Sequence, residues 1–196
     1  MGLFRKSRSV EEGQELRRLA TRGSLEEFLA VYRPADATDA ELGVDLLFEA
    51  VRNKDIAART GIVTRLLDDG ADATAIRKDA GILQHLLSYG VHDFPAEVPL
   101  LRRLLDEGAD VNRVDRKNGT PLEALAAQFK FSDEQLAPFY DVLLAHPRLD
   151  PLQDSVFGRT VLGNVRNWRD GRPDLVARLE QLLVDRGVPV PPYENA

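Results

Sequence analysis

The chain has 196 residues, of which 43% are hydrophobic and 30% charged, as is typical of a single soluble globular domain. Its formal net charge of -6 disfavours a phosphate-rich partner, so we expect no nucleic-acid binding. Because cysteine is absent and the apolar runs are too short for a bilayer, we exclude disulfides and thiolate metal sites, and we expect a cytoplasmic protein without membrane contact.

Two serines mark the first predicted helices. Ser9 and Ser24 are each followed three residues later by glutamate, a capping-box pattern, and the two helices are expected to end at Gly23 and Pro34. Residues 1–8 precede them as a short basic arm, which we interpret as a solvated tail.

The next segment is predicted to contain two helices separated by an insertion. Thr38 with Glu41 forms a further capping-box pattern and starts the first helix. The helical pattern resumes only at Ile62 and ends at Gly70. We therefore interpret residues 53–61 as an insertion between the helices, within which residues 56–59 could extend either helix.

A similar interruption is predicted further along the chain. Residues 81–89 have the apolar spacing of a helix, and Leu100 begins another. Because Pro95 and Pro99 lie between them, we interpret residues 90–99 as a stretched connection.

The clearest motif begins at Thr120. Its hydroxyl can cap a helix, Pro121 occupies the first helical position without needing a donor, and Glu123 can reach back to the Thr120 amide. Gly108-Ala109-Asp110 precedes this motif as the end of a helix with a left-handed cap. Together, the two passages resemble the ankyrin repeat.

The last predicted helices follow the same order. Ser132 starts one helix, and residues 157–162 resemble the ankyrin Gly-x-Thr-Pro-Leu motif. A final helix is predicted from Pro173 to Gly187. Residues 188–196 are proline-rich and are expected to form an extended tail on the last repeat.

The resemblance implies an all-α fold, an ankyrin-type helical repeat solenoid with short hairpin tips. It places one repeat domain over residues 9–187. The expected repeats, about five and degenerate, are 9–36, 37–75, 76–113, 114–152 and 153–187. The family usually has a histidine that ties neighbouring hairpins together. This chain has Glu123 at that position, which puts that hydrogen bond in question.

Ankyrin-type arrays bind partners through a concave surface formed by the hairpin tips and the exposed side of each first helix. The residues that we predict to contact a partner are Arg77, Lys78, Asp79, His85, Tyr89, Asp115, Arg116, Lys117, Glu123, Gln128, Asp154 and Phe157. The sole tryptophan, Trp168, is interpreted as a core residue or a partly buried cap.

Catalytic chemistry is not indicated by the sequence. The chain has no phosphate loop, nucleophile elbow or cysteine nucleophile, and its histidines lack metal-ligand spacing. We therefore expect no enzyme, no metal and no cofactor. One alternative stays open, in which His85, Tyr89 and His92 border a small-molecule pocket of an unrecognised enzyme or regulator.

These patterns favour a protein-binding module that is monomeric without its partner. Small stand-alone bacterial ankyrin-like proteins are often similar to immunity proteins, which bind and silence a cognate toxin. The acidic net charge would favour a basic toxin. An immunity-type inhibitor is thus the leading hypothesis, and a non-inhibitory scaffold that recruits a protein partner is the alternative.

Overall fold

The computed structural model describes residues 8–193, which are mostly helical and contain one two-stranded sheet, so the all-α prediction is confirmed. These residues form two compact units with a boundary between Ala73 and Thr74, inside the range where one repeat domain was expected. Each unit is described here by itself. Within the described range, no helix has the length and apolar character needed to cross a membrane.

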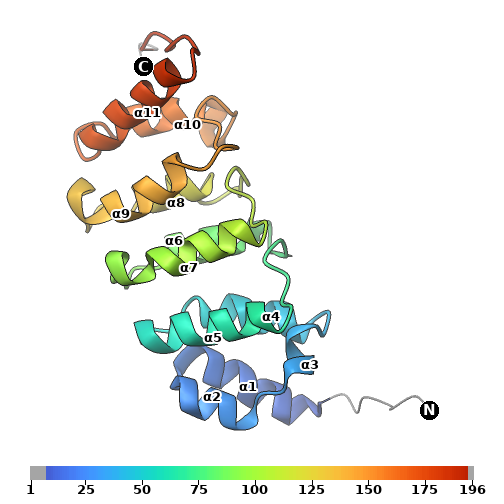
Figure 1. The fold of residues 1–196 in the computed structure, drawn as a ribbon. Helices are drawn as coiled ribbons and strands as arrows, with labels where there is room; N and C mark the ends of the chain where they lie inside the picture. Colours follow the sequence, from blue (N-terminus) through green and yellow to red (C-terminus); the bar gives the residue numbers. More distant parts are fainter. Residues whose placement is uncertain (1–7, 194–196) are drawn as a thin grey trace. The chain divides into compact units, whose positions relative to one another are not determined.

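Unit 1 contains two helix pairs and a short connecting helix. Its elements are α1 (Val10–Arg22), α2 (Leu25–Val31), α3 (Pro34–Ala37), α4 (Leu42–Ala50) and α5 (Ile56–Asp68). Helix α1 packs on α4 and α2 packs on α5 (Figure 1). The capping boxes predicted at Ser9 and Ser24 are both present, which confirms these helix starts.

Two predictions for unit 1 were wrong at helix ends, and the structure decides a third that was left open. Pro34 does not simply end a helix but opens α3, where its missing donor has no cost. Helix α4 is capped by Asp39, whose carboxylate accepts from the Leu42 amide at 2.9 Å, and not by Thr38. Helix α5 starts at Ile56 under the Asp55 cap, so residues 56–59 extend the second helix and the insertion over 53–61 is largely helical.

Arg8 is anchored to unit 1, although we expected it to belong to a solvated arm. Its guanidinium donates to both carboxylate oxygens of Asp36, at 2.7 and 2.6 Å, and to the Val31 carbonyl at 2.5 Å. Both charged side chains are less than a tenth exposed. The rest of the predicted arm, residues 1–7, lies outside the described residues.

Unit 2 repeats the order hairpin, first helix, second helix. Its elements are β1 (Ile76–Arg77), β2 (Ala80–Gly81), α6 (Ile82–Leu87), α7 (Phe94–Asp106), α8 (Pro121–Ala126), α9 (Asp133–Leu144), the 3-10 turn η1 (Val156–Gly158), α10 (Val161–Asn167) and α11 (Pro173–Asp185). The first helices α6, α8 and α10 pack on one another in order, and so do the second helices α7, α9 and α11. Hairpin loops lie on one side of the unit and the turns within each helix pair on the other (Figure 1).

Helix α7 replaces most of the stretched connection that we predicted over residues 90–99. It begins at Phe94 because the Asp93 carboxylate accepts from the Ala96 amide at 3.1 Å. Pro95 lies in the first turn, where its missing amide is tolerated, and Pro99 removes only one internal hydrogen bond. Burial of Phe94 and the following leucines outweighs that loss.

The strongest predicted helix start in unit 2 is confirmed. Thr120 and Glu123 form the reciprocal capping box, and Pro121 is the first helical residue of α8. Ser132 caps α9 in the same way through Gln135. These local interactions fix where each helix begins and, in consequence, which of its faces is buried.

The second helix of this pair contains a tyrosine that should make stability depend on alkaline pH. Burial and the nearby Asp133 carboxylate raise the pKa of Tyr140, whose hydroxyl donates to Asp133 at 3.1 Å. Unfolded tyrosine ionises near pH 10, whereas folded Tyr140 resists ionisation. Its contribution is therefore fully present below about pH 10 and is lost as the pH rises further.

We expect the free energy of unfolding to fall as the pH rises above about 10, and to fall less steeply in Tyr140→Phe. Urea titrations at several pH values measure how steeply the free energy of unfolding falls with pH in the unsubstituted protein and in Tyr140→Phe. Tyr193→Phe, at a half-exposed position, is the matched control. Equal slopes for Tyr140→Phe and the unsubstituted protein would contradict this role of Tyr140.

Candidate protein-binding surface

The first hairpin of unit 2 is a tight two-residue turn. Ile76 pairs with Gly81 and Arg77 with Ala80, which leaves Lys78 and Asp79 as the central residues. Both have left-handed backbones, with φ of 51° and 69°, in a turn type that usually uses asparagine or glycine. This conformation costs on the order of 1 kcal/mol per residue, and it exposes the Lys78 and Asp79 side chains.

The second hairpin, residues 114–119, is shaped from inside by Asp115. One carboxylate oxygen accepts from the amides of Lys117 and Asn118, at 2.6 and 2.7 Å. Asp115 is only 3% exposed, so the prediction that it contacts a partner is wrong. Its role is to fold the turn so that Arg116 and Lys117 are exposed at the tip.

The third hairpin, residues 154–160, carries an exposed aromatic side chain. Phe157 is 76% exposed and has φ of 61°, a left-handed conformation that is uncommon for a bulky residue. A backbone bridge between Asp154 and Thr160 closes the base of this hairpin. Asp154 itself is exposed, as predicted.

Glu123 holds the third hairpin in place from the neighbouring repeat. Its fully buried carboxylate accepts from Ser155 Oγ at 2.5 Å, from Asn164 Nδ2 at 2.7 Å and from the Thr120 amide at 2.7 Å. Asn164 also donates to the Val156 carbonyl at 3.0 Å. The prediction of a partner-facing Glu123 is therefore wrong. The sequence had put in question whether neighbouring hairpins are linked by a hydrogen bond at this position. The Glu123 carboxylate makes that link, through its bonds with Ser155 and Asn164.

A glutamine has the corresponding role one repeat earlier. Gln84 is 1% exposed, accepts from the Gly81 amide at 3.1 Å and donates to the carbonyls of Arg113 and Gly119. Neither Gln84 nor Asn164 was predicted from the sequence to join neighbouring repeats. The signal for Gln84 was its position three residues after the helix cap Gly81, which is the position that Glu123 has after Thr120.

The predicted residues on the first helices contribute less surface than expected. His85 and Tyr89 are half-buried on and after α6. Gln128 is half-buried because its amide donates to the Ser88 carbonyl at 2.7 Å, a bond between neighbouring repeats. The exposed part of the predicted site therefore lies mainly at the hairpins.

His92 does not share an exposed surface with the half-buried His85 and Tyr89. Its ring is buried, with Nδ1 2.9 Å from a Glu97 oxygen, and it stacks on Phe94 with ring centroids 4.9 Å apart. Neither of the two cavities described for the structure is lined by these three residues. Among residues 8–193, no group of three or more histidines and carboxylates is placed to hold a metal ion.

The three hairpins form one surface, which we call the hairpin edge, residues 76–81, 114–119 and 154–160. Its first two tips carry the cations Arg77, Lys78, Arg116 and Lys117, while Asp79 is their one exposed carboxylate. The hairpin edge is thus locally positive in a chain whose net charge is -6. We expected no such gathering of positive charge from the sequence.

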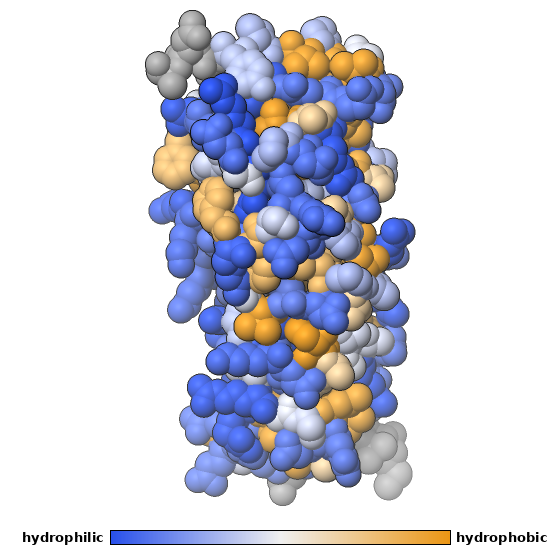
Figure 2. Space-filling view, turned by 90° about the vertical axis from the view of Figure 1, so that its left-hand side faces the viewer, coloured by the Kyte–Doolittle hydropathy of each residue, from blue (hydrophilic) through white to orange (hydrophobic). Residues whose placement is uncertain are grey.

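The opposite side of unit 2, where paired helices join, has a different character. Trp168 is partly buried at the end of α10. Its ring packs edge-on against the Phe129 ring, with the two ring centroids 5.9 Å apart. Figure 2 views the molecule from this side and shows mostly hydrophilic residues with separated apolar patches. This side therefore offers useful control positions for tests of the hairpin edge.

Comparison with known proteins establishes similarity of fold only. No protein-family model and no curated protein matches the chain. A solved structure described as a functionally unknown protein from Leptotrichia buccalis C-1013-b is similar to it, with a TM-score of 0.65 and 20% sequence identity. The match covers 91% of this chain and 100% of that one, and at this identity it establishes similarity of fold alone.

Proposed function

We propose that the protein is a protein-binding module of the ankyrin-repeat type. In this proposal, the hairpin edge binds one cognate partner and masks its active surface, as an immunity-type inhibitor does. The repeated order of hairpin and helix pair in unit 2 supports the repeat assignment. The observation that carries the binding function is Phe157, an aromatic side chain 76% exposed on a hairpin with a strained backbone.

Phe157 has the properties of an interface anchor. An exposed phenylalanine gains free energy when a partner removes it from water, and aromatic residues are enriched at interface cores. Its hairpin is already ordered by the Ser155 and Asn164 contacts with Glu123, so binding would cost little conformational entropy. Strain retained at an exposed tip is also typical of functional sites.

The charge of the hairpin edge points to an acidic contact patch on the partner. Our sequence-based preference for a basic toxin rested on the net charge of the whole chain. Local charge governs a contact more than net charge does, because surface electrostatic interactions are screened beyond about 8–10 Å at physiological ionic strength. Arg116 and Lys117 should therefore pair with carboxylates around the pocket that receives Phe157.

Affinity capture with three bait proteins tests this proposal. The baits are the unsubstituted protein, the double variant Phe157→Ala with Arg116→Ala, and a control with Phe129→Ala and Arg102→Ala, which alters exposed residues away from the hairpin edge. We expect the unsubstituted and control baits to retain one stoichiometric partner. The hairpin variant should bind it at least about 30-fold more weakly, as loss of a hot-spot residue predicts.

An activity assay on the captured partner separates inhibition from recruitment. An inhibitor should abolish the partner's activity at a one-to-one ratio, whereas a scaffold should leave it intact. If the hairpin variant binds the partner as tightly as the unsubstituted protein does, the hairpin edge is not the binding surface. Circular dichroism of each bait verifies that its fold is retained.

A further inference from the structure

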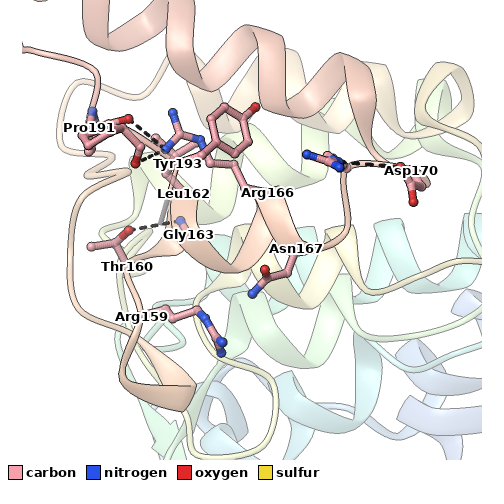
Figure 3. Close-up of a pocket in the computed structure, with 11 residues that line it drawn as sticks. Arg159, Thr160, Leu162, Gly163, Arg166, Asn167, Asp170, Pro191 and Tyr193 are labelled. Atoms are coloured by element: carbon pink, nitrogen blue, oxygen red, sulfur yellow. Dashed lines mark hydrogen bonds and ion pairs between the residues drawn. The ribbon is translucent and has the colours of Figure 1, made fainter. Parts of the chain in front are cut away.

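A second candidate site lies beside α10, under the C-terminal tail. It is a cavity of about 680 Å³, bounded by α10, the end of the third hairpin and Pro191–Tyr193 of the tail (Figure 3). Its polar lining includes Arg159, Thr160, Arg166, Asn167 and Arg169. This volume is within the range of small-molecule binding sites, about 300–1,000 Å³.

Arg166 builds one wall of this cavity. Its guanidinium donates to the Pro191 carbonyl at 2.9 Å and lies 4.1 Å from the centroid of the Tyr193 ring. The same guanidinium pairs with Glu180 at 2.8 Å, so its charge is already compensated. Arg166 is therefore a positioning residue that holds the tail beside α10.

Arg159 is different, because its charge is not compensated in the same way. The guanidinium makes no hydrogen bond or ion pair with any residue between 8 and 193. Asn167 is exposed, and its side-chain amide likewise has no partner within that range. Figure 3 shows both side chains extending from the hairpin and α10 into the same region.

The remaining charges in the cavity leave it positive. Arg169 lies 3.8 Å from Asp170, the one acidic residue of the lining, in a pair that is largely exposed to solvent. Such a pair contributes little and competes weakly with a ligand. An arginine fork with a nearby amide donor is chemically suited to the oxygens of a phosphate or carboxylate group.

We propose that this cavity binds a small organic anion bearing phosphate or carboxylate groups. Arg159 would contact the anion through its guanidinium, and Asn167 would donate a second hydrogen bond. The proposal is independent of the protein-binding function, since it requires no protein partner. It adds a ligand site that shares Arg159 and Thr160 with the hairpin edge.

Calorimetric titration of the full chain with pyrophosphate and, separately, with citrate tests the site. We expect saturable binding of at least one probe, weakened about tenfold or more in Arg159→Gln and unchanged in Arg102→Gln, a control on the exposed side of α7. Binding of pyrophosphate alone identifies a phosphate ligand, and binding of citrate alone identifies a carboxylate ligand. A resonance shift of the Arg159 side-chain Nε–H on titration would place the anion at that guanidinium.

Two results would overturn the proposal. One is the absence of binding by both probes at low ionic strength, where attraction to a cationic site is strongest. The other is equal weakening by Arg159→Gln and Arg102→Gln, which would show non-specific attraction to the surface. A thermal melt of each variant verifies that the cavity is compared in folded proteins.

Discussion

Replacement of Arg172 by methionine is expected to lower the free energy of unfolding by about 3 kcal/mol or more. Arg172 is 1% exposed, and its guanidinium donates to the carbonyls of Ala126 at 2.6 Å and Phe131 at 3.0 Å. These carbonyls belong to the end of α8 and the turn before α9, whereas Arg172 itself immediately precedes α11. Methionine keeps the apolar volume but leaves buried carbonyl groups without donors.

The geometry explains why a lysine should not restore this stability. From the start of α11, the arginine fork reaches two carbonyls of the preceding repeat at once, and its Cζ lies 5.1 Å from the centroid of the Phe129 ring. Its remaining nitrogen, Nη2, has no hydrogen-bond partner among the described residues, so Arg172 also bears a desolvation cost. The net effect is still stabilising, because several charge-assisted bonds join α8, α9 and α11.

Urea unfolding followed by Trp168 fluorescence measures this effect within unit 2. Trp168 is the sole tryptophan and contacts Phe129, so its emission should respond when the turns around Arg172 open. Arg169→Met is the matched control, since the Arg169 side chain is 65% exposed. A difference below about 0.5 kcal/mol between Arg172→Met and the unsubstituted protein, the range typical of surface substitutions, would show that Arg172 does not join the repeats.

Replacement of Glu123 by alanine is expected to cost about 2–4 kcal/mol. The substitution removes the Glu123 half of the capping box, which leaves the Thr120 amide without its acceptor, and it also deprives the buried donors of Ser155 and Asn164 of theirs. The Thr120 hydroxyl still accepts from the amide of residue 123, so the helix keeps this part of its cap. Each buried polar group left without a partner contributes about 1–3 kcal/mol before relaxation.

Glu123→Gln should be less destabilising than Glu123→Ala. Its amide oxygen can still accept from the Thr120 amide, and Asn164 can turn its own oxygen toward the new NH₂ group. Urea unfolding of both variants, with exposed Glu134→Ala as control, tests this order. Hydrogen exchange should also become faster at the Ser155 amide, and unchanged exchange there would contradict the proposed support of the third hairpin.

The capping-box pattern predicted four helix starts correctly and one, at Thr38, incorrectly. Ser9, Ser24, Thr120 and Ser132 each have a glutamate or glutamine three residues later, and all four cap helices as predicted. Asp55 and Asp93 cap their helices without such a residue, since alanine occupies the third position in both cases. Their helices were therefore placed too late in the sequence.

The prolines misled the prediction of α7. Pro95 lies where a helix needs no amide donor, but its position in the first turn was evident only once Asp93 was known to be the cap. Pro99 lies inside the helix, and burial of the leucines that follow it overcomes the lost bond. Tertiary packing therefore stabilises the start of α7, although the local propensity of its prolines disfavours a helix there.

For the candidate site, the hairpin tips were predictable but the burial of its members was not. Repeat spacing indicated that Arg116, Lys117 and Phe157 lie at tips, and all three are exposed. Burial of Glu123 depends on donors 32 and 41 residues away, at Ser155 and Asn164. No local pattern contains that information.

Site-directed photocrosslinking in the source cell tests the hairpin edge most directly. A photoreactive phenylalanine analogue replaces Phe157 in one protein and the exposed Phe129, in the turn between α8 and α9, in the other. We predict a single adduct of defined mass from position 157 and none of that mass from position 129. The same adduct from both positions, or from position 129 alone, would contradict the assignment of the hairpin edge as the binding surface.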